Sequence, residues 1–151
     1  MIIGIDPGLK KTGVCLYDEA KDKVVELYTS GYAIASLMEH LEDIKNKRNV
    51  SVVIESFEPQ PWKTNGRLPR GSKAMFELVD TLRYLAQEVH NRRTYLQSPS
   101  EVARELRDDD IKKYLLAHKE VERKANKHER DALKHALYCA SKLKMYGLVK
   151  K

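Results

Sequence analysis

The chain has 151 residues, of which 42% are hydrophobic, and it carries 28 Lys and Arg against 22 Asp and Glu, a formal net charge of +6. This length suits one domain over residues 1–151, with a hydrophobic core that needs no disulfide bond. No apolar run approaches the roughly 20 residues that span a bilayer, and the first residues lack a signal-peptide pattern, so we expect neither a membrane protein nor a secreted one.

Three strand patterns open the sequence, over residues 1–6, 12–17 and 23–32. Each is apolar or alternates between apolar and polar residues, and turn-forming residues such as Pro7 and Gly8 separate them. Because the connections are short, we expect these strands to form an antiparallel three-strand meander.

A helix, a buried strand and a long loop follow. Apolar residues recur at spacings of three and four over residues 34–44, which predicts an amphipathic helix. Residues 50–56 form a nearly unbroken apolar run that closes near an acid, as a strand buried on both faces does. Residues 57–73 have no periodicity and hold three prolines and two glycines, so we expect a long functional or mobile loop.

The second predicted helix, over residues 73–90, has more apolar surface than one sheet can cover. One apolar stripe comprises Met75, Val79, Leu82, Ala86 and Val89. A second stripe comprises Phe76, Leu78 and Leu85. One stripe can pack on the sheet, and the other needs an adjacent helix or another subunit.

The last third is mainly helical. Ser98 and Glu101 form a capping box with Pro99 at the first helical position, so a helix begins there. The acidic residues 108–110 end or re-cap that helix. The remaining elements are a short strand over 94–97 and helices over 111–124 and 129–145. The whole order predicts an α/β fold, with a five-stranded mixed sheet flanked by helices.

The distribution of charge indicates a class of partner, and the placement of the cysteines indicates a cellular compartment. Residues 1–50 carry a net charge of −1, residues 51–100 carry +2, and residues 101–151 carry +5. The basic last third favours a polyanion such as nucleic acid, or else a solvated, salt-bridged helical surface. Cys15 and Cys139 match no metal or redox spacing, so we expect two reduced core thiols in a cytoplasmic protein.

Two carboxylates end predicted strands. Asp6 closes the first strand before Pro7 and Gly8, and Glu55 closes the apolar run of the fourth. A turn-forming Asp and an exposed strand end are the plain structural alternatives. If the two strands pair in parallel, the carboxylates lie side by side, and their repulsion favours a cation between them.

The last helix adds two further candidates. His128 and Asp131 share one helix face at the i, i+3 spacing, in the first predicted turn. The alternatives are an ordinary surface histidine and an acid that complements the helix dipole. The small residues Ala132, Ala136 and Ala140 form a stripe that can pack closely on the sheet, and Asp131 adjoins it.

Three carboxylates and one imidazole make an oxygen-rich ligand set. Such ligands suit Mg²⁺ or Mn²⁺, and two such ions catalyse in-line hydrolysis of a phosphodiester. The sequence contains no Gly-x-Ser-x-Gly motif, P-loop or GxGxxG motif, so nothing favours a Ser or Cys nucleophile.

The motifs resemble those of the RuvC-type Holliday-junction resolvases. Residues 3–8, followed by Thr12-Gly13-Val14, resemble the first motif of that family, and residues 53–55 resemble its second acidic strand end. Residues 98–102 resemble its Pro-Ser-Glu-Val segment, and residues 128–132 resemble its carboxyl-terminal HxxDA motif. These matches occur in order over nearly the whole chain.

The resemblance implies a ribonuclease H-like fold and a homodimer that makes paired, symmetric nicks in four-way DNA junctions, with two Mg²⁺ or Mn²⁺ ions per site. It implies that helix 73–90 forms the dimer interface. The proline-rich segment 57–70 and the charged segment 107–124 depart from the family pattern, which indicates a divergent branch of viral or phage type. The four residues that would bind metal and catalyse are Asp6, Glu55, His128 and Asp131.

The resemblance also implies that an aromatic side chain near the second acid stacks on an unpaired base. Phe57 is the nearest candidate and Trp62 the next, with core or loop packing as the alternative. Basic residues that flank the predicted site are candidates to contact phosphates. They are Lys10, Lys11, Lys63, Arg67, Arg70, Lys73, Lys119, Arg123, Lys124 and Lys127.

Three rival functions remain. A YqgF-like nuclease of ribosomal RNA processing shares the Ile-Asp-Pro-Gly start, but the long helix and the HxxDA-like motif favour the resolvase. A nucleic-acid-binding protein without catalysis would not need all four candidate ligands. A fragment of the actin-like ATPase fold would need a second phosphate loop, which the sequence lacks.

Overall fold

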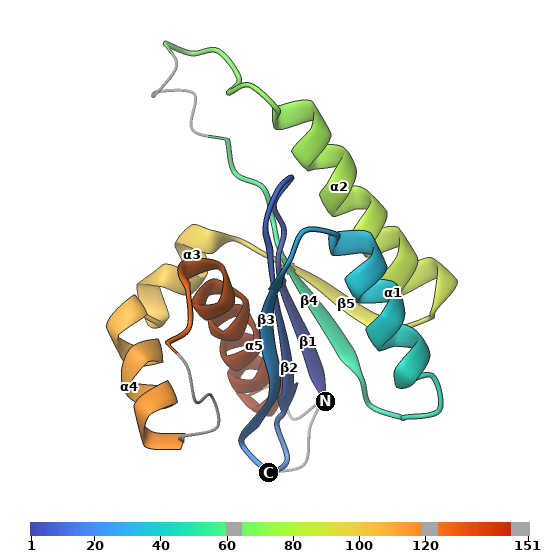
Figure 1. Cartoon of the computed structure of the whole chain (residues 1–151), viewed down its shortest axis with the longest axis vertical. Helices are drawn as coiled ribbons and strands as arrows, with labels where there is room; N and C mark the ends of the chain where they lie inside the picture. The colour runs from blue at the N-terminus through green and yellow to red at the C-terminus, as the bar shows by residue number, and fades with distance from the viewer. Residues whose placement is uncertain (60–64, 119–123, 146–151) are drawn as a thin grey trace.

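The computed structural model describes residues 1–59, 65–118 and 124–145, and its centre is a five-stranded sheet in the order β3-β2-β1-β4-β5 (Figure 1). β1 pairs with β2 and β2 with β3 in antiparallel fashion, whereas β1–β4 and β4–β5 are parallel. The predicted mixed sheet, with its three-strand meander, is therefore confirmed. The strands are β1 Ile2–Asp6, β2 Thr12–Asp18, β3 Lys23–Ser30, β4 Ser51–Glu55 and β5 Arg93–Gln97.

Helices cover both faces of this sheet (Figure 1). One apolar core lies between the sheet and α1 and α2, and a second lies between the sheet and α5, with α4 packed outside α5. The helices are α1 Ala33–Asp43, α2 Ser72–Tyr84 with its π-helical continuation η2 Leu85–Val89, α3 Pro99–Glu105, α4 Asp108–His118 and α5 Lys127–Met145.

Some predicted boundaries differ from the observed ones. The acidic run 108–110 forms the first turn of α4, where carboxylates complement the helix dipole. α5 begins at Lys127, so Asp131 lies in its second turn and the prediction of the first turn is wrong. The predicted helix 111–124 runs partly outside the described residues. Ser98 caps α3, as predicted, by accepting a hydrogen bond from the backbone of Glu101.

Two glycines let α5 lie directly on the sheet. A Cβ atom at Gly13 in β2 would lie 2.0 Å from the carbonyl oxygen of His128, and one at Gly4 in β1 would lie 2.4 Å from that of Ala132. Real Cβ atoms essentially never come that close, so only glycine fits at either position. The stripe that contains Ala132 and Ala136 is fully buried against these strands, as its small residues predict.

The two cysteines are free and buried, and burial raises the pKa of the Cys139 thiol to about 12 and that of the Cys15 thiol further. This matches the expected core thiols. Within the described ranges, no helix has the length and apolar character needed to cross a membrane.

Candidate active site

The carboxyl ends of β1 and β4 bring two acids together. The parallel register pairs Ile5 with Ile54, so the residues that follow, Asp6 and Glu55, lie next to each other at one end of the sheet. Burial, followed by the charges of Glu55 and Asp131, raises the pKa of Asp6 from its ordinary 3.8 to about 6, against the opposing effect of His128. Three carboxylates therefore interact at this point, as the strand-end argument predicts.

The amino-terminal end of α5 carries the other side chains of this group. Its first turn is fixed by a capping box, in which the backbone nitrogen of Glu129 donates to Asn126 Oδ1 at 3.0 Å. The backbone nitrogen of Asn126 donates in return to Glu129 Oε2 at 3.1 Å. This cap and the close contact at Gly13 hold His128 and Asp131 over the ends of β1 and β4.

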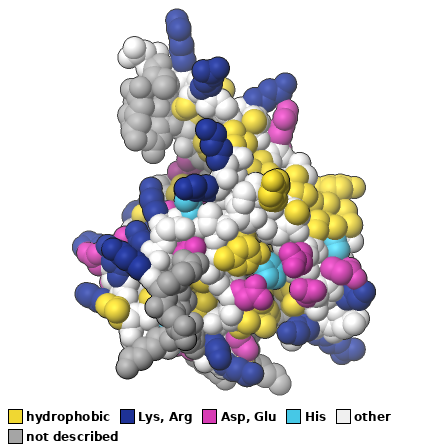
Figure 2. All heavy atoms as spheres, in the orientation of Figure 1, with side chains coloured by type: hydrophobic (Ala, Val, Ile, Leu, Met, Phe, Trp, Pro, Cys, Tyr) yellow, Lys and Arg dark blue, Asp and Glu magenta, His cyan; other side chains and the backbone are white. Residues whose placement is uncertain are grey.

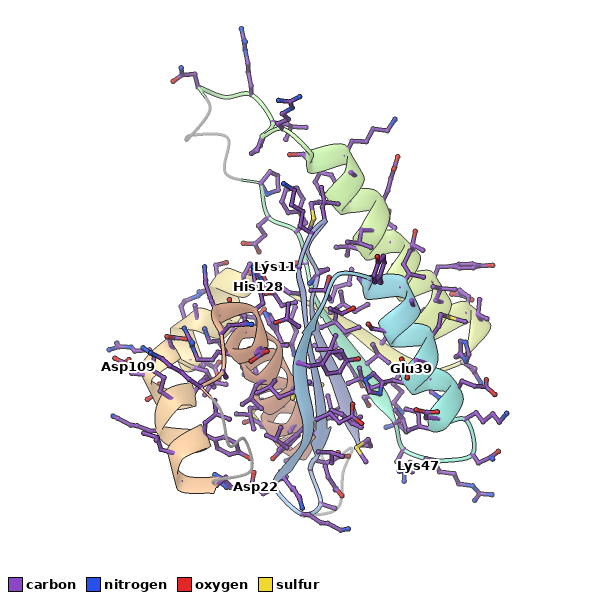
Figure 3. The ribbon with its side chains drawn as sticks, in the orientation of Figure 1. Lys11, Asp22, Glu39, Lys47, Asp109 and His128 are labelled. Carbon is purple, nitrogen blue, oxygen red and sulfur yellow. The ribbon has the colours of Figure 1, made fainter. Side chains whose placement is uncertain are left out.

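Each of the three carboxylates is paired with one nitrogen-bearing side chain of α5. His128 Nδ1 lies 2.9 Å from Asp6 Oδ2. Figure 3 labels His128 beside Lys11, in the middle of the molecule. The other pairs are His135 Nε2 with Glu55 Oε2 at 2.8 Å and Lys134 Nζ with Asp131 Oδ1 at 3.0 Å. We call these six residues the paired cluster.

The paired cluster has the donor chemistry of a divalent-cation site, but its carboxylates are engaged with nitrogens. Among the described residues, no group of three or more His, Cys, Asp or Glu side chains is gathered closely enough to hold a metal ion. The raised pKa of Asp6 nevertheless reflects burial first and then repulsion from Glu55 and Asp131, and a cation would relieve that repulsion. Three carboxylates and the imidazole of His128 fit Mg²⁺ or Mn²⁺ by ligand type.

Sequence reasoning missed three members of this region: Lys134, His135 and Gln97. Gln97 ends β5 in register with Glu55, and its Oε1 lies 2.9 Å from His135 Nδ1. His135 follows Asp131 by four residues and His128 by seven, so helical spacing places it on the same face. That spacing, with a polar residue ending the strand next to β4, could have identified both residues.

The predicted nucleic-acid contacts lie in different surroundings. Phe57 is half-buried and packs edge to face on Phe76, with ring centroids 5.1 Å apart. Trp62, Lys63, Lys119 and Arg123 lie outside the described residues. The remaining basic candidates are all exposed, and Figure 2 shows Lys and Arg side chains from the projecting end of the molecule down towards its middle. These are Lys10, Lys11, Arg67, Arg70, Lys73, Lys124 and Lys127.

The helix predicted to form a dimer presents apolar side chains to solvent. Its inner stripe is buried through Val79, Leu82 and Ala86. Phe76 in α2 is 43% exposed, and Val89 in η2 is 52% exposed. By its sequence spacing Val89 belongs to the same stripe as Val79, Leu82 and Ala86, which are buried. The π-helical turn changes the helical phase, which is the physical reason that this end departs from the predicted spacing.

Comparison with known proteins finds similarity only at the level of structure. No family model matches the sequence. No curated protein matches it either. The structure resembles that of Thermus thermophilus RuvC in complex with a Holliday junction substrate, with a TM-score of 0.71 and 15% identity, over 95% of this chain and 94% of that one.

Two other solved structures are similar over most of their length. The yeast mitochondrial Holliday junction resolvase Ydc2 has a TM-score of 0.58 and 13% identity, over 96% of this chain and 80% of that one. The fowlpox virus resolvase, solved with Holliday junction DNA, has a TM-score of 0.51 and 12% identity, over 95% of this chain and the whole of the other. The chain therefore has the ribonuclease H-like fold of the junction resolvases.

Proposed function

We propose that the chain is a metal-dependent endonuclease that resolves four-way DNA junctions by paired, symmetric nicks. The observation that carries this proposal is the group of carboxylates at the ends of β1 and β4 and on α5, on a fold shared with junction resolvases. Residues 1–151 would form one nuclease domain.

Asp6, Glu55, Asp131 and His128 would hold the metal. Divalent cations, when bound, supply activation of water and stabilisation of the leaving oxygen. The carboxylates of the chain would fix the cations at the ends of two rigid strands, which keeps the geometry constant between substrates. His128, whose side chain is 41% exposed, would leave Asp6 and turn towards the incoming cation. Since water is the nucleophile, no covalent enzyme intermediate forms.

Exposed Lys and Arg side chains would bind the phosphate backbone. Lys10 and Lys11 lie in the turn before β2, and the backbone of Gly13 in β2 touches that of His128. Arg70 lies just before α2, and Lys73 lies in its first turn. Contacts of this kind position the substrate and make binding weaken steeply with salt.

A homodimer would supply the second active site. A four-way junction has two-fold symmetry, so paired nicks need two sites related by the same symmetry. The exposed apolar side chains along α2 and η2, among them Phe76, Tyr84 and Val89, supply a surface for such an interface. We therefore expect dimerisation through the helix of residues 73–90.

The test is cleavage of a labelled, immobile four-way DNA junction with Mg²⁺ and with chelator. We expect wild-type protein to nick two opposing strands at symmetric positions only with metal, and Asp6→Asn to bind the junction without cutting it. Asp22→Asn is the matched control, since Asp22 lies in the β2–β3 turn and contacts α4 instead of the paired cluster.

Other outcomes would replace this proposal. Wild-type protein that binds the junction with Mg²⁺ present and never cuts it would be a nucleic-acid-binding protein. Protein that ignores junctions and trims structured RNA would be a processing nuclease of the YqgF-like type.

A further inference from the structure

One histidine of the paired cluster differs from its neighbours in burial and in the number of its partners. His135 is 1% exposed and lies between α5 and the ends of β4 and β5. Its Nε2 lies 2.8 Å from Glu55 Oε2, and its Nδ1 lies 2.9 Å from the side-chain amide of Gln97. Both ring nitrogens are thus engaged by residues that end adjacent strands.

The proton arrangement follows from these partners. An ionised carboxylate only accepts hydrogen bonds, so Nε2 carries a hydrogen and donates it to Glu55. A glutamine amide presents either its oxygen or its NH₂ group, so Gln97 accepts from or donates to Nδ1 as required. The ring therefore keeps its orientation, because rotation would break two hydrogen bonds in a buried setting.

The other two pairs lack this constraint. His128 has an imidazole 41% exposed with one carboxylate partner, and Lys134 reaches Asp131 on a flexible four-carbon stem. The imidazole of His128 can move into solvent and leave Asp6 when a cation arrives, whereas the Lys134 side chain is only 12% exposed but has a single carboxylate partner in this cluster. His135 has no solvent to move into, so its bond to Glu55 persists.

We propose that His135 is the positioning residue of this active site, holding Glu55 by one carboxylate oxygen so that the other oxygen is presented to the cation. This inference rests on the proposed function, which supplies the cation. Removing a residue that hydrogen-bonds to a metal ligand typically lowers metal affinity about 10- to 100-fold. Glu55 needs such a partner because it is the last residue of β4 and, unlike the four buried residues before it, is partly exposed to solvent.

The experiment measures Mn²⁺ binding to the DNA-free protein by titration calorimetry. We expect His135→Met, which removes the donor at similar size, to weaken binding about 10- to 100-fold. His135→Gln keeps an N–H donor near the position of Nε2, so its affinity should recover most of that loss. His40→Met is the matched control, because His40 is also buried but belongs to α1, on the opposite face of the sheet, where it bonds Tyr28.

A second measurement uses the wild-type protein and needs no variant to fold. Nitrogen NMR of the imidazoles during Mg²⁺ titration should retain the His135 Nε2–H resonance with metal bound, while the His128 resonances shift. Loss of the His135 resonance on metal binding, or equal affinities for His135→Met, His135→Gln and wild type, would overturn the inference. Equal losses in the His135→Met and His40→Met proteins would also overturn it, since the effect would then be structural.

Failure of this inference is distinguishable from failure of the proposed function. If wild type cuts junctions but the His135 variants bind Mn²⁺ normally, only the positioning role is wrong. If the His135 variants lose Mn²⁺ affinity but wild type never cuts a junction, only the nuclease function is wrong. If wild type binds no Mn²⁺, both are wrong.

Discussion

Two aspartate–histidine contacts lie apart in the molecule, one near the His128 label in the middle of Figure 3 and one near the Asp22 label at its foot, and they differ in their electrostatics. Asp6 meets His128 beside two further carboxylates, and burial followed by the charge of Glu55 raises its pKa to about 6. Asp22 meets His118 at 3.2 Å. Partial burial acts to raise the pKa of Asp22, but hydrogen bonds from Tyr17, Tyr114 and His118 lower it overall.

The difference lies in the ratio of acceptors to donors. One carboxylate among two hydroxyls and an imidazole is satisfied, and this hairpin clasp, made of Asp22, Tyr17, Tyr114 and His118, joins the β2–β3 turn to α4. Three carboxylates that share three donors repel each other and are destabilised without a cation. Functional sites commonly give up stability in this way.

The same substitution in both places should therefore have opposite effects. Asp6→Asn removes a repelled charge, so the metal-free protein should gain stability at pH 8 while metal-dependent junction cleavage disappears. Asp22→Asn removes a satisfied acceptor, so stability should fall by about 1 kcal/mol, discounted for its exposure, and cleavage should persist. Urea unfolding in EDTA and the junction assay measure the two effects.

Added Mg²⁺ sharpens this contrast. Bound metal stabilises the native state by mass action, so the urea midpoint of wild type and of Asp22→Asn should rise with Mg²⁺ concentration, while that of Asp6→Asn should not. A rise of equal size in Asp6→Asn would contradict a metal site at the paired cluster.

The next prediction concerns the close contact between Gly13 and the backbone of His128, which positions the paired cluster and not the hairpin clasp. Gly13→Ala would place a methyl group 2.0 Å from the carbonyl oxygen of His128 and push the start of α5 off the sheet. We expect a loss of about 3 kcal/mol and a large fall in Mn²⁺ affinity. Gly31→Ala is the control, because the nearest atom to its added methyl group is 3.8 Å away, and its effect should be under about 1 kcal/mol.

The pH dependence of the metal-free protein should separate the two aspartates again. Between the ordinary pKa of 3.8 and the folded value of about 6, the native state binds more protons at Asp6 than the unfolded state. Its contribution to stability therefore falls as pH rises through this window, by about 2 kcal/mol. Asp22 has a lowered pKa, so its contribution is present above the ordinary value and is lost as pH falls.

Urea unfolding of wild type, Asp6→Asn and Asp22→Asn in EDTA from pH 4 to 8 tests the signs. Relative to wild type, the gain in Asp6→Asn should grow from pH 4 to 6 and then level off. A gain that is constant with pH would mean that Asp6 is not the group that titrates.

Much of the site could be predicted because its acids end strands. An apolar run closed by Asp6 or Glu55 is visible in sequence, and parallel pairing of the strands makes the acids neighbours. His135 and Gln97 were missed because a histidine inside a helix resembles a surface residue until the end of β5 is known to reach it. The hairpin clasp was missed for a similar reason, since its bond from Tyr114 to Asp22 spans 92 residues.

The smallest effect is expected at the cap of α5, which aligns the paired cluster without belonging to it. Asn126→Ala removes the acceptor for the backbone nitrogen of Glu129 and should cost about 1 kcal/mol, whereas Asn126→Asp keeps that acceptor but loses the amide donor to Thr29 Oγ1, so it should recover only part of the loss. Because Gly13 and Gly4 still seat the helix on the sheet, Mn²⁺ affinity should fall only a few-fold in Asn126→Ala. A fall as large as that of Gly13→Ala would mean that the cap, and not the glycine contact, sets the position of His128 and Asp131.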